Sequence, residues 1–181
     1  MVRRSLSQQP LTANTGPMAT LTAELSITKA DPLGQEALAL LREAAIEARE
    51  RYPESTALDT SWPTNDPTLP RGIYLVARAG GKPVASGALR PLSKNIAEVR
   101  RVFVTRAARG NGLAMAMLRE LEFHAARFGY ETMWLETGNR QFQAVALYEK
   151  YGFKRIQPFG QHINDPTSVC FGKSVQGKDG A

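Results

Sequence analysis

The chain has 181 residues, of which 43% are hydrophobic and 22% charged, and its net charge is +6. This length suits one globular domain with a substantial core and is short for two. The single cysteine excludes an internal disulfide, and two histidines with one cysteine are too few to predict a metal site. The basic residues are spread along the chain, so we expect no nucleic-acid partner, and no run approaches the roughly 18 apolar residues of a membrane span. We therefore predict a cytoplasmic protein that binds no metal.

Both ends of the chain differ in composition from the rest. Residues 1–20 are polar, contain two prolines and a glycine, and show no apolar periodicity, so we predict a disordered arm. This arm lacks the apolar run of a secretory signal, although its arginines and serines and its lack of acids also resemble an organelle transit peptide. Residues 177–181 are predicted to be a disordered tail, which leaves residues 21–176 as one domain.

The N-terminal part of the predicted domain begins with a strand, a helix and a loop. Residues 24–30 alternate weakly and predict a short strand. Asp31 suits a helix N-cap and Pro32 the first turn, and apolar residues at helical spacing continue to about Arg51. Residues 52–72 contain four prolines and predict a long ordered loop with room for one helical turn.

Three strands are predicted next. Residues 72–79 and 82–92 flank Gly80–Gly81, a pair typical of a tight β-hairpin. Residues 95–105 predict a further strand. Its alternation places five residues on one face: Ile96, Glu98, Arg100, Val102 and Val104.

The C-terminal half alternates helices and strands. A long helix ending at Gly129 carries an apolar stripe formed by Ala114, Leu118, Leu121, Ala125 and Phe128. The segments that follow are a strand at 131–137, a helix at 141–152 closed by Gly152, and strands around 153–157 and 168–174. This order favours an α/β (α+β) domain, with a curved, mostly antiparallel mixed sheet and helices on both faces.

The junction between the strand at 95–105 and the long helix has the sequence RGNGLA, residues 109–114. The first N–H groups of a helix lack intrahelical acceptors, and glycines let a ligand approach the backbone, so this junction is suited to a phosphate group. The pattern lacks the Gly-Lys-Ser/Thr ending of a P-loop and is not GxGxxG, which disfavours an NTPase or a dinucleotide enzyme. Taken alone, it also fits a tight structural connection.

Two sequence motifs, one after the other in the chain, make this sequence similar to a known family. Arg109-x-x-Gly112-x-Ala114 follows the strand residues Val102-Phe103-Val104, and ALYEKYGF at 146–153 comes later. Together they resemble the pyrophosphate motif and the Tyr-x-x-x-Gly-Phe helix end of the GNAT superfamily of acyl-CoA-dependent N-acetyltransferases. The resemblance covers about residues 23–175 and is strongest from Ala97 to Phe153.

The resemblance implies acetyl-CoA (coenzyme A) as cosubstrate. The backbone of Val102, Phe103 and Val104 would pair with the pantetheine amides, and Tyr148 would be the general acid near the thioester sulfur. Gln141 stands where the family commonly has Asn, and we expect it to keep a cofactor contact. Main-chain N–H groups would wrap the pyrophosphate along the turn Arg109, Gly110, Asn111, Gly112, Leu113, Ala114 and Met115.

Acyl transfer to an amine also requires a base, because a free alkyl ammonium must lose a proton. Glu98 is the candidate, since it stands 14 residues before Gly112, where several family members carry a catalytic Glu. The structural alternative is an ion pair with Arg100 or with a cross-strand neighbour. We predict direct transfer to a small amine that enters between the 53–70 and 157–167 loops. A protein or peptide acceptor, a non-catalytic acyl-CoA sensor and a homodimeric state remain alternatives.

Four further side chains can titrate or react, and the sequence predicts where each of them lies. Cys170 lies in an apolar strand without a neighbouring His and is predicted to be a buried, inert thiol. His124, on the long helix, is predicted to be a surface or boundary residue. His162 lies in a loop that could border the acceptor site, and Glu136 ends a strand where it could orient the acceptor.

Overall fold

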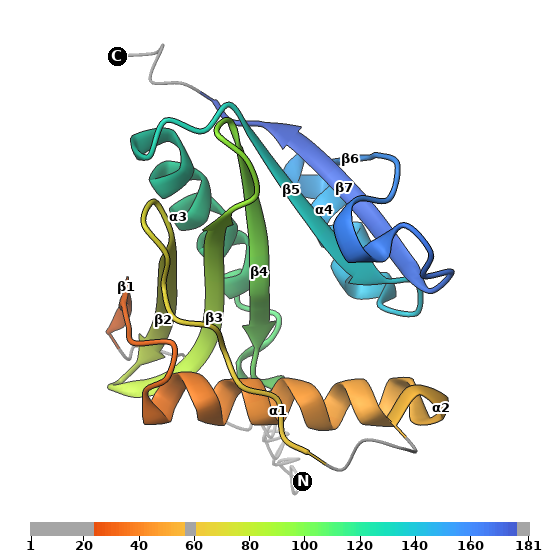
Figure 1. Cartoon of the computed structure of the whole chain (residues 1–181). Coiled ribbons are helices and arrows are strands. Elements are labelled where there is room, and N and C mark those ends of the chain that lie inside the picture. The colour runs from red at the N-terminus through yellow and green to blue at the C-terminus, as the bar shows by residue number, and fades with distance from the viewer. Residues whose placement is uncertain (1–23, 57–60, 177–181) are drawn as a thin grey trace, which may run out of the picture.

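The computed structural model describes residues 24–56 and 61–176, so the predicted arm at 1–20 and tail at 177–181 lie outside the described residues (Figure 1). The elements in chain order are β1 (Leu25–Lys29), α1 (Gln35–Arg51), α2 (Pro53–Thr56), β2 (Ile73–Ala79), β3 (Lys82–Pro91), β4 (Ile96–Val104), α3 (Leu113–Arg127), β5 (Thr132–Gly138), α4 (Phe142–Tyr151), β6 (Lys154–Arg155) and β7 (Ser168–Ser174). The strands form one sheet in the order β1-β2-β3-β4-β5-β7-β6. Every neighbouring pair is antiparallel except β4 and β5, which α3 connects as a parallel crossover.

Helices cover both faces of the sheet, as predicted. On one face α1 packs Ala37 and Leu40 against Tyr74 and Val76 of β2. On the other face α3 and α4 cover a larger core (Figure 1). The fully buried residues at the centre of that core are Leu75, Met117, Leu118, Leu121, Met133, Leu135 and Phe171. The mixed, mostly antiparallel α/β architecture expected from the sequence is therefore confirmed.

Helix α1 begins later than the sequence indicates. Asp31 caps a turn instead of the helix, because its Oδ1 accepts the Leu33 N–H at 3.0 Å and its carbonyl accepts the Gly34 N–H at 3.0 Å. Gly34 is then the N-cap and the helix starts at Gln35. The β2–β3 hairpin is as predicted, with Gly80 and Gly81 both at positive φ (56° and 78°), as a two-residue type I′ turn requires.

Strand β4 contains a β-bulge that reverses part of the predicted alternation. Arg100 lies opposite Ala88 and Phe103 opposite Ser86, so two residues of β4 face the single residue between those partners. The first of the two is Arg101, which has a φ of 58°. The prediction that one face carries Glu98, Arg100, Val102 and Val104 is therefore wrong. The extra residue inverts the alternation, so Glu98 faces α1 together with Phe103, while Val104 joins the core under α3.

The sheet opens between β4 and β5. The two strands pair only from Ile96 opposite Thr132 to Val99 opposite Leu135, and beyond this point they diverge (Figure 1). Residues 100–104 of β4 consequently have no strand partner on their β5 side within the described chain. This free edge lies inside the molecule, between the two halves of the sheet.

Candidate functional site

A cavity of about 1010 Å³ occupies the space between the diverging strands. Its walls come from the end of β4, the start of α3, the second half of α1 and one side of α4. The structure brings nearly all of the predicted cofactor residues to this one cavity. Those on its wall are Val102, Phe103, Val104, Arg109, Gly110, Gly112, Leu113, Ala114, Met115, Gln141 and Tyr148.

The start of α3 presents unpaired backbone donors to the cavity. The first intrahelical bond runs from the Ala116 N–H to the Gly112 carbonyl, so the N–H groups of residues 113–115 have no helical acceptor. Gly110 and Gly112 have φ of 80° and 74°, and a Cβ built on either would meet nothing within 4 Å. The positive end of the α3 dipole and these donors together form a site suited to an anion.

Asn111 is the predicted cofactor residue that the cavity wall does not include. Its Nδ2 donates to the carbonyls of Ala108 (3.1 Å) and Arg109 (3.2 Å), so the side chain shapes the turn. The Arg109 side chain is also engaged within the protein. Its Nε donates to the Val104 carbonyl at 3.1 Å, and its Nη2 donates to both carboxylate oxygens of Glu47 at 2.8 Å. The backbone of this turn, more than its side chains, is therefore what faces the cavity.

Helix α1 contributes to the site, although its sequence did not lead us to predict this. Its buried residues Ala37, Leu40 and Leu41 pack against the sheet, but three half-buried alanines farther along line the cavity. These alanines are Ala44, Ala45 and Ala48. The change from leucine to alanine along one helix leaves room for a ligand and was the available signal. Glu47 carries no such signal, because its pairing with Arg109 links segments 62 residues apart.

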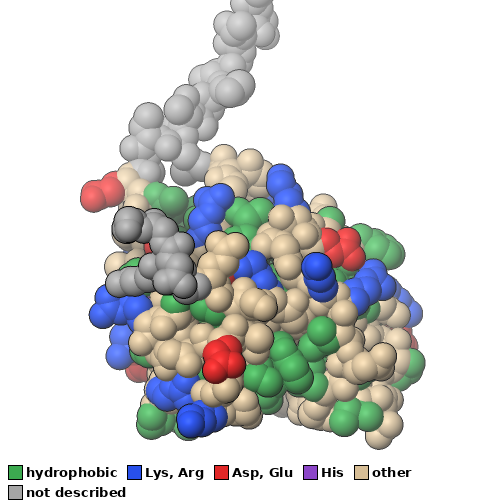
Figure 2. Space-filling model, turned by 90° about the horizontal axis from the view of Figure 1, so that it is seen from above, with side chains coloured by type: hydrophobic (Ala, Val, Ile, Leu, Met, Phe, Trp, Pro, Cys, Tyr) green, Lys and Arg blue, Asp and Glu red, His purple; other side chains and the backbone are tan. Residues whose placement is uncertain are grey.

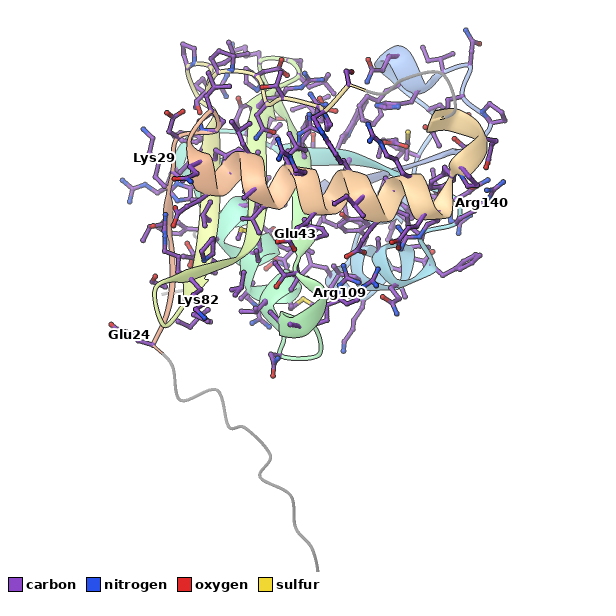
Figure 3. All side chains as sticks on the ribbon, turned by 90° about the horizontal axis from the view of Figure 1, so that it is seen from below. Glu24, Lys29, Glu43, Lys82, Arg109 and Arg140 are labelled. Atoms are coloured by element: carbon purple, nitrogen blue, oxygen red, sulfur yellow. The ribbon has the colours of Figure 1, made fainter. Side chains whose placement is uncertain are left out.

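The far end of α1 is tied to the β5–α4 turn through Arg140. The Arg140 N–H donates to the Tyr52 hydroxyl at 2.9 Å, and its guanidinium donates to the Arg51 carbonyl and forms an ion pair with Glu54 at 2.7 Å. Figure 3 shows Arg140 at the C-terminal end of α1 and Arg109 beside its middle. The two arginines thus fasten α1 across the opening of the sheet.

Tyr148 lies on α4 with its ring packed near Phe153 and Phe171, at centroid distances of 5.9 and 6.1 Å. The residue is buried and lines the cavity. Burial, and to a lesser extent the negative charge of Glu136, raises the pKa of its hydroxyl above the ordinary value. The phenol therefore stays protonated at neutral pH and can donate a hydrogen bond to a developing anion in the cavity.

Glu98 is 4% exposed and lies outside the cavity wall. Its Oε2 accepts a hydrogen bond from Arg90 Nε at 2.5 Å, and Arg100 Nε lies 4.0 Å from its other oxygen. Arg90 is its cross-strand neighbour on β3, so the ion pairs considered as the structural alternative are formed. Glu98 is therefore held in ion pairs and does not line the cavity.

Glu136 and His162 meet on the face of the sheet that Glu98 occupies. Glu136 accepts a hydrogen bond from Ser168 Oγ at 2.8 Å, and its other oxygen lies 3.9 Å from His162 Nδ1. The His162 side chain is 14% exposed and comes from the 157–167 loop, as predicted. The two residues are therefore close enough to act as a unit.

The remaining two candidates, Cys170 and His124, are packed against other side chains and lie outside the cavity wall. Cys170 is 2% exposed, and burial raises the pKa of its thiol, which fits the inert thiol predicted from the sequence. His124 is half-buried between the rings of Phe123 and Phe128, and burial lowers its pKa. Neither residue lines the cavity.

The described segments contain no candidate metal site and no candidate membrane span. Residues 24–56 and 61–176 contain no group of three or more His, Cys, Asp or Glu side chains placed to hold a metal ion. None of the helices described above has both the length and the apolar character needed to cross a bilayer. Figure 2 shows Lys and Arg side chains dispersed over one face of the molecule, between apolar and uncharged ones.

Comparison with known proteins decides the family. A model of the Acetyltransferase (GNAT) family matches residues 35–153. The chain belongs to the GNAT acetyltransferase family. This GNAT protein is 32% identical over 153 residues to an IAA acetyltransferase from Azospirillum brasilense, covering 83% of this chain and 98% of the relative. GNAT proteins are acyltransferases, and the chain is therefore an acyltransferase enzyme.

Solved structures agree with the fold. A structure described as an acyl-CoA N-acyltransferase from Klebsiella pneumoniae is 31% identical, with a TM-score of 0.69, and covers 87% of this chain and 100% of the other. A GNAT family acetyltransferase from Elizabethkingia anophelis with acetyl-CoA bound superposes with a TM-score of 0.58. The overlap covers 83% of this chain and 98% of the other, at 17% identity, so this second likeness concerns the fold alone.

Proposed function

We propose that this GNAT enzyme transfers an acetyl group from acetyl-CoA to the primary amine of a small molecule, directly and within a ternary complex. The observation that carries the proposal is one cavity that joins the unpaired donors at the start of α3 to the free edge of β4. Coenzyme A contains a diphosphate and a chain of amide groups. The diphosphate suits the donors at the start of α3, and the amide groups suit the free edge of β4.

In this proposal the diphosphate binds the N–H groups of residues 109–115, and the pantetheine amides run along residues 102–104 like an added strand. Gln141 lines the same cavity and would contact the pantetheine from α4. Residues 102–104 precede 109–115 in the chain, so the thioester would lie beyond Val102, toward the bulge. Tyr148 would stand near the sulfur.

The transfer itself needs one proton to leave nitrogen and one negative charge to be stabilised on sulfur. The amine nitrogen attacks the thioester carbonyl, the N–C bond forms, and the C–S bond breaks to release the thiolate. We propose that Glu98 accepts the amine proton through water, since it does not reach the cavity, and that Tyr148 donates to the thiolate. With its raised pKa, Tyr148 is better suited to donating a hydrogen bond than to complete proton transfer, because a thiol titrates near about 8.5.

The acceptor would enter between the 53–70 and 157–167 loops. Residues 57–60 of the first loop lie outside the described residues. A small amine is proposed ahead of a protein or peptide because nothing in the sequence suggests an extended peptide groove. A non-catalytic acyl-CoA sensor on the same fold is the second candidate, and it is favoured by the engagement of Glu98 with Arg90.

Two measurements test the proposal. Calorimetry should detect acetyl-CoA binding, and thiol release should follow when the protein, acetyl-CoA and a panel of small amines are mixed. Binding without release over a broad panel, peptides included, would favour the sensor. Absence of binding at millimolar acetyl-CoA would contradict both candidates.

A further inference from the structure

Arg101 occupies an unusual position at the thioester end of the cavity. It has positive φ at the β4 bulge and contributes to the cavity wall. Its Nε donates to Asn65 Oδ1 at 2.9 Å, and Asn65 is 4% exposed and fixed in turn by a bond from its Nδ2 to the Pro32 carbonyl. The guanidinium is thus held in place by a neutral amide and not by a carboxylate.

The charges around Arg101 do not balance. Within the described chain no carboxylate oxygen lies within 4.0 Å of its guanidinium. The nearby acids Glu98 and Asp66 are shared by Arg90 and Arg100, so three arginines face two carboxylates. Burial, and then the positive charge of Arg100, lowers the pKa of Arg101. A partly buried cation without a counter-ion is costly, and an anion delivered to the cavity beside it would remove that cost.

A second observation concerns the hydroxyl of Tyr74, which lies near Arg101. The Tyr74 hydroxyl is fully buried and makes no hydrogen bond of good geometry, although Ser86 and Asn65 lie close enough to interact with it. Ser86, Asn65 and Arg101 all lie near it, and each also makes other hydrogen bonds. The Ser86 hydroxyl, on the cavity wall, donates to the Arg101 carbonyl at 2.8 Å, and the Asn65 amide is used at both ends. A buried donor without a well-formed hydrogen bond is rare in native structures and calls for an explanation.

We propose that the acyl acceptor is an amine that also carries a carboxylate, and that Arg101 binds this carboxylate at the thioester end of the cavity. The inference rests on the proposed function, which sets the diphosphate at residues 109–115 and so leaves Arg101 for the second substrate. A guanidinium binds a carboxylate through two parallel hydrogen bonds. The Ser86 hydroxyl can turn its proton toward the same carboxylate while its oxygen accepts from Tyr74, because a hydroxyl oxygen accepts whichever way its proton points.

The test compares pairs of acceptors that differ only in the carboxylate. Free L-amino acids and their carboxamides are assayed with the full chain and acetyl-CoA by thiol release, and kcat/KM is compared within each pair. Amidation lowers the pKa of the amine and so supplies more of the reactive neutral form. A preference for the acids therefore cannot come from intrinsic reactivity. We expect the acids to be favoured by about 10- to 100-fold, the range for a hydrogen bond to a charged group.

Variants then assign the preference to Arg101. Arg101→Gln should bring the acid-to-amide ratio to about one, and Arg101→Lys, which keeps the charge, should retain a part of it. Arg78→Gln is the matched control, because Arg78 is an arginine of β2 that is already paired with Glu36. Acetyl-CoA affinity, measured by calorimetry, should be the same in all four proteins. The Arg101→Lys comparison decides the matter if Arg101→Gln does not fold.

The outcomes separate the two proposals. Equal kcat/KM for acids and amides, or a preference that survives in Arg101→Gln, overturns carboxylate recognition and leaves acetyl transfer standing. A loss of acetyl-CoA affinity in the Arg101 variants overturns it too, since Arg101 would then serve the cofactor. Acetyl-CoA binding with no thiol release from any acid, amide or other amine overturns the proposed function and this inference with it.

Discussion

Gly112 and Gly81 share a backbone conformation and differ in what lies in front of them. Their φ angles are 74° and 78°, and at both positions an added Cβ would meet no other atom within 4 Å. Only Gly112 opens onto the cavity, where the proposed diphosphate would lie. The two glycines therefore let the cost of backbone strain be separated from the cost of blocking a ligand.

We expect Gly112→Ala and Gly81→Ala to destabilise the fold alike, by about 1–2 kcal/mol each, because both force an alanine into the left-handed region. Only Gly112→Ala should weaken acetyl-CoA binding, by about 10- to 100-fold, as lost hydrogen bonds to a charged group would. Thermal unfolding and calorimetry of both variants give the two quantities. Equal affinities in the two variants would show that the diphosphate lies elsewhere.

Tyr148 and Tyr151 form a second matched pair, on one helix. Tyr148 faces the cavity, whereas the Tyr151 hydroxyl donates to Glu122 at 2.7 Å. We expect Tyr148→Phe to lower kcat by about 100-fold or more, the usual scale for a lost hydrogen-bond donor to a developing negative charge, with acetyl-CoA affinity unchanged. Tyr151→Phe should lower stability but leave kcat unaltered. Steady-state rates with any accepted amine measure kcat for both variants. An unchanged kcat in Tyr148→Phe would show that Tyr148 takes no part in the mechanism.

At the scale of elements, α1 both packs and lines the site. Its first half buries leucines against the sheet, and its second half places alanines and Glu47 on the cavity wall. Glu47 accepts both hydrogen bonds from Arg109 Nη2, and Arg106 Nε lies 3.9 Å from it. A carboxylate thus sits beside the proposed diphosphate and holds two arginines that could otherwise face it.

We expect Glu47→Gln to tighten acetyl-CoA binding by about two- to fivefold at low salt, since it removes a repulsive charge, and the gain should shrink as salt screens it. The stability cost should stay within about 1 kcal/mol, as for other partly exposed pairs. Glu43→Gln, one turn earlier on the exposed side of α1, is the control and should change neither quantity. Weaker binding in Glu47→Gln would mean that Glu47 positions Arg109 for the ligand.

The elements themselves were largely predictable, and the way their side chains meet was not. Gly80–Gly81 and the apolar stripe of α3 are local signals, and the hairpin and helix followed from them. The bulge at Arg101 places a non-glycine residue at positive φ, which no local pattern indicates, and it put Val102 and Val104 on the opposite face from Glu98, against the prediction that the three share one face. The pairing of Glu47 with Arg109 depends on how α1 crosses the sheet, which sequence periodicity does not specify.

At the scale of the whole molecule, the two halves of the described sheet are joined by the four residue pairs between β4 and β5. Helix α3 crosses between them, and Glu122 on this helix binds both Lys173 of β7 and the Tyr151 hydroxyl of α4. The Glu122 and Lys173 side chains are only 13% and 11% exposed. Burial raises the pKa of Glu122, but the hydrogen bonds from Lys173 and Tyr151 outweigh it, and the net pKa lies below the ordinary value.

A carboxyl with a lowered pKa in the folded state stabilises the protein above its unfolded pKa of about 4.3, and this contribution is lost as pH falls through the folded value. We expect Glu122→Gln to reduce the free energy of unfolding by about 3 kcal/mol at pH 7, as for a broken buried pair. The difference in the free energy of unfolding between this variant and the wild type should become smaller below about pH 4. Urea unfolding at both pH values measures this, with Glu149→Gln, in an exposed pair with Arg155, as control. A difference that does not depend on pH would mean that packing, not charge, is what Glu122 contributes.

The free edge of β4 has a consequence for solubility. An exposed strand edge recruits strands from other chains and starts aggregation, and proteins usually blunt it with charge, proline or a bulge. Here residues 100–104 keep their edge open toward β5, but α1 and α4 line the cavity beside this edge and shield it. The fold can therefore keep the hydrogen-bonding groups of this strand edge available, without offering them to the strands of other protein chains.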